Sequence, residues 1–152
     1  MEIRSLAKEA VIISSDATFR EAVALMVRKQ TNSLLVTNED GELVGEINVS
    51  DLLDAIVPID VTGDDIEEKL GSETAFGNAV MAASDLSVQD FMNSNIQPVH
   101  VDDSLIAIAG KAIAYQTAHL PIVDHDEHPI GIISRRGLKH ILAKYLDIKD
   151  TK

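Results

Sequence analysis

The sequence predicts a mixed α/β fold of the α+β type, in which two tandem copies of one β-α-β-β-α unit pack as a pseudo-twofold pair. The first observation is the stretch from Leu34 to Leu52, which has the pattern of strand, tight turn, strand and helix start. The second is the return of this layout 86 residues later, from Leu120 to Leu138. The third is the composition: 152 residues, 45% hydrophobic but only 3% aromatic, suit an aliphatic core of ordinary domain size.

Local signals place the elements of the first copy. Residues 2–11 carry apolar side chains at helical spacing and predict a short helical lead-in, which is followed by a brief strand at Ile12 and Ile13. Thr18, with Glu21 three residues later, has the pattern of a capping box and predicts the start of a helix. The hairpin and the helix after it complete the order β-α-β-β-α.

The second copy emerges when the chain is shifted by 86 residues, because apolar positions and glycines then fall in step. Gly45, for example, aligns with Gly131, and the alignment needs no gap from Ile12 to Ile56. Each copy is too small to bury its own faces, so the two should pack on each other as one module. We expect the first motif with its lead-in at 1–56, and the second motif with a C-terminal helix at 85–152.

Residues 57–84 match neither copy and predict a helical connector. Pro58 ends the preceding helix. Acidic residues early and a lysine late in GDDIEEKLG, residues 63–71, suit the dipole of a short helix. The stretch ETAFGNAVMAA predicts a second, weaker helix that Gly77 interrupts. We therefore expect an inserted pair of short helices.

Charge and composition exclude several classes of protein. The formal net charge of −12 argues against nucleic acid and an anionic membrane as partners. The absence of cysteine excludes disulfides, thiolate metal sites and cysteine nucleophiles. No apolar run approaches the roughly 20 residues that a membrane span needs, and the N-terminal MEIRSLAKEA lacks the apolar region of a signal peptide. We expect a cytoplasmic protein.

Three patterns mark the repeats: a D-x-T/S-aliphatic opening at 16–19 and 102–105, the strand LPIVD at 120–124, and a G-x-I-x-x-x-x-L ending in both copies. With these patterns each half resembles a CBS motif, and the two together resemble a CBS-domain pair, or Bateman module. The resemblance covers nearly the whole chain except 57–84 and the last few residues. It implies an adenosine-containing ligand in clefts between the paired repeats, and a homodimer arranged side by side as a flat disc.

The resemblance also implies ligand-binding positions. In the family, a hydroxyl residue three places after the hairpin glycine contacts phosphate, and an aspartate three residues further accepts hydrogen bonds from both ribose hydroxyls. These positions hold Asn48 and Asp51 in the first repeat. In the second repeat they hold Ser134, which Arg135 follows, and Gly137, which cannot hold a ribose. We expect one nucleotide anchored at Asp51, against the alternative that Asp51 is only a charge at a helix start.

Further candidates come from the strands. His119 precedes LPIVD where the family often has a basic residue facing phosphate; the alternative is an ordinary strand histidine. Ile13, Val36 and Val99 are candidate walls for an adenine ring, and each also suits the hydrophobic core. Arg135 and Arg136 both suit surface charges that balance an acidic chain, and Arg135 alone is also a candidate phosphate contact.

The turn from Asp124 to His128 carries two histidines with carboxylates around them, a set that can chelate a divalent ion. Polar residues accumulate at hairpin tips in any case. We therefore favour a solvated turn and expect no metal site and no catalytic cofactor.

The sequence predicts a binding module that senses AMP, ADP or ATP and passes a change of shape to an unknown effector protein. The alternative is a structural dimerisation or interaction module whose clefts have lost their ligand. An enzyme is disfavoured because no P-loop, nucleophile elbow or HExxH motif is present. Exposed apolar residues near Ile106–Ile108 and Ile141–Leu142 favour a homodimer.

Overall fold

The computed structural model describes residues 3–57, 72–115 and 119–149. The chain divides into two compact units. The first unit consists of Val11–Asp40 and Val44–Asn95, and the second unit consists of Met1–Ala10, Gly41–Leu43 and Ile96–Lys152.

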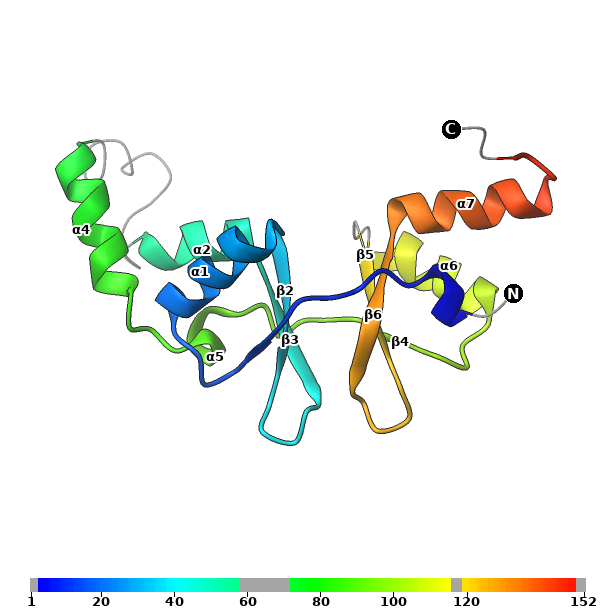
Figure 1. Cartoon of the computed structure of the whole chain (residues 1–152), viewed down its shortest axis with the longest axis horizontal. Coiled ribbons are helices and arrows are strands. Elements are labelled where there is room, and N and C mark those ends of the chain that lie inside the picture. The colour runs from blue at the N-terminus through cyan, green and yellow to red at the C-terminus, as the bar shows by residue number, and fades with distance from the viewer. Residues whose placement is uncertain (1–2, 58–71, 116–118, 150–152) are drawn as a thin grey trace. The chain divides into compact units, whose positions relative to one another are not determined.

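The first unit is built on a three-stranded sheet in the order β1-β2-β3 (Figure 1). Its strands and helices are β1 (Ile12–Ser14), α1 (Phe19–Lys29), β2 (Ser33–Thr37), β3 (Leu43–Asn48), α2 (Val49–Ile56), α4 (Glu73–Ala83) and α5 (Val88–Phe91). Strand β1 runs parallel to β2, which requires the crossover that α1 supplies. The predicted β-α-β-β-α order of the first copy is confirmed.

Helix α1 begins where its capping residue predicts. The Thr18 hydroxyl oxygen accepts a hydrogen bond from the Glu21 backbone N–H at 3.2 Å, which satisfies one of the orphan donors of the first turn. The helix ends at Gln30, whose positive φ of 54° is a left-handed cap. The hairpin turn likewise has Gly41 at a φ of 80°, as its turn chemistry predicts.

The second unit repeats the plan on a sheet in the order β4-β5-β6. Its elements are the 3-10 turn η1 (Ile3–Leu6), β4 (Val99–His100), α6 (Leu105–Tyr115), β5 (His119–Val123), β6 (Pro129–Ser134) and α7 (Arg135–Tyr145). Strand β4 is parallel to β5, and β5 is antiparallel to β6. Its core is aliphatic, as the composition predicts: Ile3, Val99, Ile108, Leu120, Ile122 and Ile133.

The segments that lead into the two repeats are exchanged between the units. The predicted lead-in helix over 2–11 is only the short η1, after which Lys8 pairs with Ile132 of β6 through N–H···O bonds of 2.8 and 3.0 Å. In the same way Asn93 pairs with Glu46 of β3 through bonds of 3.0 and 2.8 Å. The compact units therefore differ from the sequence repeats, since the outer strand of each sheet forms a single β-bridge with the lead-in of the other repeat.

The connector contributes helix α4, which the sequence predicts, with the Ser72 side chain accepting from the Ala75 N–H at 3.0 Å. Ala83 of α4 is buried in the core of the first unit, and Val80 is packed against that core together with Val23 of α1. The other predicted connector helix, at 63–71, lies outside the described residues. Helix α4 thus belongs to the first unit and packs on its helices.

Candidate ligand site

Asn48 and Asp51 lie together where β3 passes into α2. Asn48 is the last residue of β3 and the N-cap of α2, and Asp51 lies in the first turn of that helix. The Asp51 carboxylate oxygen Oδ2 accepts a hydrogen bond from the Asn48 backbone N–H at 2.7 Å. Asp51 therefore acts as a charged residue at a helix start, which was the alternative interpretation. One of its two carboxylate oxygens is occupied by the Asn48 N–H.

The carboxylate of Asp51 is half-buried and lies among other acids. Burial raises its pKa above the usual value, the Asn48 N–H bond opposes that effect, and the charges of Glu46 and Asp54 raise the pKa further. No cation of the described chain forms an ion pair with it in the structure. The charged form of Asp51 therefore has one backbone N–H but no positive charge beside it, and hydrogen-bond donors from a ligand would stabilise it.

The equivalent junction in the second unit is the passage from β6 into α7. Ser134 is the N-cap, and its hydroxyl oxygen accepts from the Gly137 N–H at 3.2 Å. Arg135 is exposed at the first position of the helix. The Arg136 Nε lies 3.4 Å from the His140 Nε2 on the next turn. Gly137, the counterpart of Asp51, supplies a backbone N–H here instead of a carboxylate.

His119 is brought next to Ser134. The two residues are opposite each other in the antiparallel register of β5 and β6, and both are half-buried. Residues at such positions have Cβ atoms about 4.5–5.5 Å apart. The structure therefore gathers His119, Ser134 and Arg135 where β5 begins and β6 ends, and their role toward a ligand stays a prediction.

The three candidate walls for an adenine ring lie in the two cores. Ile13 and Val36 are register partners on β1 and β2, with exposed fractions of 7% and 0%. Val99 pairs with Ile122 and is also fully buried. Their burial matches the alternative interpretation of each as a core residue, and contact with a ligand is not tested by the structure.

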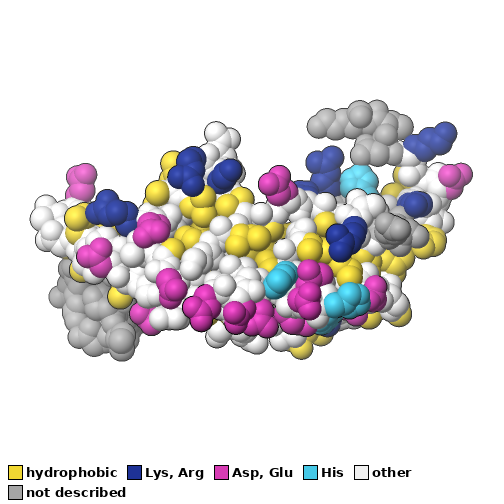
Figure 2. Space-filling view, turned by 60° about the horizontal axis from the view of Figure 1, so that its bottom comes forward, with side chains coloured by type: hydrophobic (Ala, Val, Ile, Leu, Met, Phe, Trp, Pro, Cys, Tyr) yellow, Lys and Arg dark blue, Asp and Glu magenta, His cyan; other side chains and the backbone are white. Residues whose placement is uncertain are grey.

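The hairpin tip from Asp124 to His128 is held by its own backbone. Asp124 Oδ1 accepts from the N–H groups of Asp126 and His128 at 2.9 and 3.0 Å, which lowers the pKa of that carboxyl below its usual value. His125 pairs with Asp102 at 2.9 Å. Figure 2 shows histidines beside acidic side chains on one face. Within the described residues, no three His, Asp or Glu side chains converge as a metal site would require.

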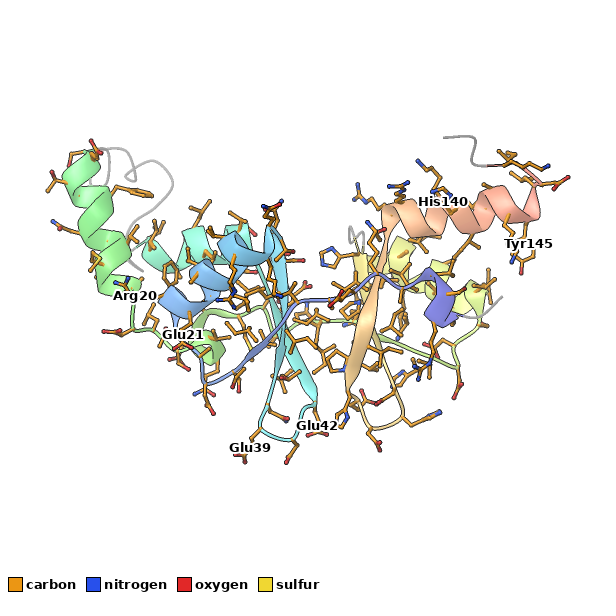
Figure 3. All side chains as sticks on the ribbon, viewed as in Figure 1. Arg20, Glu21, Glu39, Glu42, His140 and Tyr145 are labelled. Atoms are coloured by element: carbon orange, nitrogen blue, oxygen red, sulfur yellow. The ribbon has the colours of Figure 1, made fainter. Side chains whose placement is uncertain are left out.

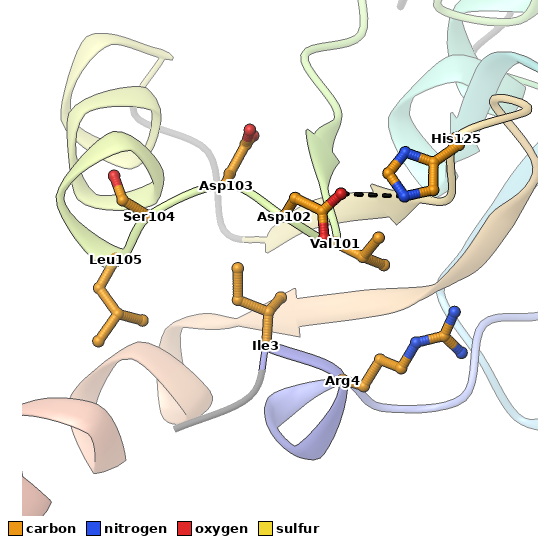
Figure 4. Close-up of a pocket in the computed structure, with 8 residues that line it drawn as sticks. All are labelled: Ile3, Arg4, Val101, Asp102, Asp103, Ser104, Leu105 and His125. Carbon is orange, nitrogen blue, oxygen red and sulfur yellow. Dashed lines mark ion pairs between the residues drawn. The ribbon is translucent and has the colours of Figure 1, made fainter.

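Sequence reasoning missed a pocket of about 560 Å³ in the second unit (Figure 4). It lies at the carboxyl end of β4, whereas His119 and Ser134 lie at the amino end of β5, which is parallel to β4. The residues that line it are Ile3, Arg4, Val101, Asp102, Asp103, Ser104, Leu105 and His125. The D-x-S opening was a signal for this loop, but nothing local indicated that Arg4 would join it.

A smaller pocket of about 270 Å³ in the first unit lies between α1 and α4 and is lined mainly by apolar side chains such as Val23 and Val80. Among the described helices, none is both long enough and apolar enough to cross a membrane.

A family model described as "CBS domain" matches the chain twice, at residues 2–58 and 88–144. The chain belongs to the CBS domain family. Each match includes the lead-in of its repeat, in agreement with the predicted repeat pattern, so the protein is a CBS-domain pair of the regulatory class. An uncharacterized protein of Methanocaldococcus jannaschii is 25% identical over 150 residues, which cover 91% of this chain and 89% of that one.

Solved structures share the fold. A CBS domain-containing protein of unknown function from Kribbella flavida superposes with a TM-score of 0.76 at 19% identity, over 94% of this chain and 99% of that chain. The cytosolic domain of the Mg²⁺ channel MgtE, solved in complex with ATP, gives a TM-score of 0.67 at 19% identity. That match covers 92% of this chain and 48% of the MgtE chain.

Proposed function

We propose that this CBS-domain pair binds an adenine nucleotide, AMP, ADP or ATP, and passes a conformational change to an effector protein. The observation that supports the proposal most directly is Asp51. It is a half-buried carboxylate at a helix start, with a raised pKa and no ion-pair partner in the described chain. Perturbed carboxyl groups of this kind are concentrated at binding and catalytic sites.

The chemistry of a ribose suits this carboxylate. A vicinal diol donates two hydrogen bonds, and an ionised carboxylate has acceptor sites beyond the one that the Asn48 N–H occupies. Those donors would replace the water that Asp51 loses on burial. The N–H groups at the start of α2 and the Asn48 amide would face the phosphates.

The second repeat offers phosphate-binding chemistry without the ribose carboxylate. Ser134 supplies a hydroxyl, and Arg135 supplies an exposed guanidinium suited to bidentate phosphate contact. The ATP complex of the MgtE domain fits a nucleotide ligand for this fold. We propose one strong site at Asp51 and a weaker one, or none, at Ser134.

Signalling would follow from unequal affinity. A nucleotide shifts a module between two arrangements only by the difference in its affinity for them. The module would therefore act without turnover of the nucleotide. We further propose that it does so in the cytoplasm and as a homodimer.

A second candidate is a structural interaction module with empty clefts. Two observations favour it: Gly137 replaces the carboxylate in the second repeat, and α6 and α7 expose large apolar side chains. In that case the protein partner would be the ligand, and adenine nucleotides would give no heat of binding.

Calorimetric titration of AMP, ADP and ATP into the wild type and into Asp51→Asn tests the proposal. Asp54→Asn is the matched control, because Asp54 is exposed one turn later on the same helix. We expect binding near one site per chain that is lost in Asp51→Asn and kept in Asp54→Asn. Binding that survives Asp51→Asn but fails in the double variant Ser134→Ala, Arg135→Ala would move the site to the second repeat.

A further inference from the structure

The pocket of about 560 Å³ in the second unit lies between two segments of the chain and is here called the lead-in seam (Figure 4). One side is formed by Ile3 and Arg4 of the lead-in, and the other by the loop from Val101 to Leu105, which joins β4 to α6. Its volume lies within the range of roughly 300–1,000 Å³ that is typical of ligand pockets. None of the described residues that line it belongs to the candidate nucleotide site. A ligand in this seam would therefore be separate from the nucleotide.

The equivalent seam of the first unit is closed by backbone pairing. Ser87 of the second lead-in forms an antiparallel β-bridge with Thr18, in the loop that joins β1 to α1. The Phe19 N–H donates a hydrogen bond to the Leu86 carbonyl oxygen at 2.8 Å. The segment before α5 is thus held as a short strand against this loop.

The two lead-ins correspond at an offset of 85 residues, because Asn93 and Lys8 make the equivalent pairs with β3 and β6. Val88 then corresponds to Ile3. Both side chains are buried in the core of their unit, with exposed fractions of 0% and 6%. Residues 1–2, which precede Ile3, lie outside the described part of the chain.

A backbone hydrogen bond that closes the first seam has no counterpart in the second. The Val88 N–H donates to the Ala17 carbonyl oxygen at 2.8 Å. Ile3 and Asp103 hold the equivalent positions, and no hydrogen bond joins their backbones in the structure. The lead-in and the loop of the second unit therefore share one core but stay apart at their backbones, which leaves the pocket between them.

Two backbone donors at the start of α6 lack the acceptors that their counterparts have. In the first unit the Arg20 N–H donates to the Ser84 carbonyl oxygen at 3.1 Å, beside the bond from Phe19 (Figure 3 labels Arg20). The equivalent N–H groups belong to Leu105 and Ile106, and neither forms a hydrogen bond within the described residues. The first N–H groups of a helix need acceptors from outside the helix, and the carbonyl oxygens of an added strand would supply them.

Carboxylates line the seam beside these donors. Asp102 and Asp103 both lie on it, and Asp102 Oδ2 pairs with His125 at 2.9 Å, which leaves Oδ1 for a further donor. Arg4 is the one arginine or lysine among the described lining residues, and it interacts electrostatically with Asp124 on the hairpin tip. The whole chain has a formal net charge of −12. These charges favour a partner with basic side chains.

We propose that the lead-in seam binds an extended segment of a partner protein that carries lysine or arginine. The segment lies antiparallel to the loop from Val101 to Leu105, in the place that residues 84–87 occupy in the first unit. Its carbonyl oxygens accept from the Leu105 and Ile106 N–H groups, and a basic side chain pairs with Asp102. Recognition of a strand through its backbone, with side chains that set specificity, is a general mode of peptide binding. This inference goes beyond nucleotide sensing.

A synthetic peptide and a matched pair of variants test the backbone contacts. The probe copies residues 83–88 with the change Asp85→Lys and carries a neutral fluorophore, so that fluorescence anisotropy with the full chain measures binding. We expect saturable binding of one peptide per chain. Leu105→Pro removes the N–H at a helix start, where proline is accepted, whereas Leu105→Ala removes the side chain and keeps the N–H. Affinity should be about fivefold lower in Leu105→Pro than in Leu105→Ala.

Asp102→Lys and Asp16→Lys test the charge contact as a second pair. The two aspartates are equivalent in the repeats and both are exposed, but Asp16 borders the closed seam. We expect the affinity to fall about fivefold in Asp102→Lys and to stay unchanged in Asp16→Lys. The peptide that keeps Asp85 should bind the wild type more weakly than the probe. Circular dichroism verifies folding, and this pair decides the result if Leu105→Pro does not fold.

Three results would overturn the inference. The first is the absence of saturable binding to the wild type, which is the outcome if residues 1–2 of the chain itself fill the seam. The second is equal affinity of Leu105→Pro and Leu105→Ala when both are folded. The third is equal weakening by Asp16→Lys and Asp102→Lys. Because the measurement contains no nucleotide, each result is independent of the proposed nucleotide site.

Discussion

Replacing Gly131 with alanine should loosen the exchanged lead-in from β6. A Cβ atom at this position would lie 2.8 Å from the Lys8 carbonyl oxygen and 2.9 Å from the Ala7 Cβ. Real Cβ contacts are not this short, and the oxygen belongs to the backbone, so the lead-in segment around Lys8 must move. That movement strains or breaks the two hydrogen bonds between Lys8 and Ile132, of 2.8 and 3.0 Å.

The cost can be worked from these contacts. Loss of one of the two backbone hydrogen bonds costs about 1 kcal/mol net, and forced overpacking adds about 1–3 kcal/mol. We expect Gly131→Ala to lower the free energy of unfolding by about 2–4 kcal/mol, measured by urea denaturation. In a chain of this length that corresponds to a fall in Tm of about 5–15 °C. Hydrogen exchange should show faster exchange of the Lys8 and Ile132 amides.

Two other glycines calibrate the result. Gly77→Ala lies in α4, where nothing is within 4 Å of the added Cβ, so it should be neutral or stabilise by up to about 1 kcal/mol. At Gly45 the nearest atom, at 2.6 Å, is the Met92 sulfur of a flexible side chain, so Gly45→Ala should cost less than Gly131→Ala. If Gly131→Ala is as stable as Gly77→Ala, the lead-in does not hold the sheet as described.

Three further predictions concern carboxylates. Asp51→Asn should leave the free energy of unfolding unchanged or raise it at neutral pH, because a raised pKa marks a carboxyl whose charge is unfavourable in the fold; urea denaturation beside the nucleotide titration checks both properties. Nucleotide affinity should fall as the pH drops through the raised pKa of Asp51, since only the ionised carboxylate accepts both ribose hydroxyls. The stability of the free protein depends on Asp51 in the opposite direction. The stabilising contribution of Asp51 is present below the ordinary pKa of 3.8 and is lost as the pH rises through its folded-state pKa. Calorimetry in acidic and neutral buffers tests the affinity, and a pH-independent affinity would exclude Asp51 as the acceptor. The lowered pKa of Asp124 makes its contribution present above 3.8 and lost as the pH falls through the folded-state value, so Asp124→Asn should flatten the acid limb of a denaturation series.

The elements that sequence reasoning predicted well depend on neighbours in the chain. Thr18 and Glu21 are three residues apart, and Gly41 serves its own turn, so local chemistry decides both. The helical spacing of apolar residues in 2–11 predicted a helix that does not form beyond η1, because an extended segment can carry the same residues. A pairing between Lys8 and Ile132, more than a hundred residues apart, decides the outcome.

In the candidate site, too, neighbouring residues decide some features and the fold decides others. The sequence placed Asp51 at a helix start, and the structure confirms that position. The sequence could not show that the Asn48 N–H engages one carboxylate oxygen, or that burial beside Glu46 raises the pKa. Both depend on the path of β3 into α2. Burial of Val36 and Val99 likewise depends on cores that include residues distant in the chain, such as Val88 for Val36 and Ile3 for Val99.

The exchange of lead-ins bears on how such a chain can arise by gene duplication. A polypeptide with a single repeat carries a lead-in that its own sheet does not use, so two such chains would complete each other by swapping these segments. Fusion of the two genes makes that swap intramolecular and raises the local concentration of each lead-in to that of a tethered segment. The two repeats then become mutually dependent. Fragments cut within the connector should fold better mixed than apart.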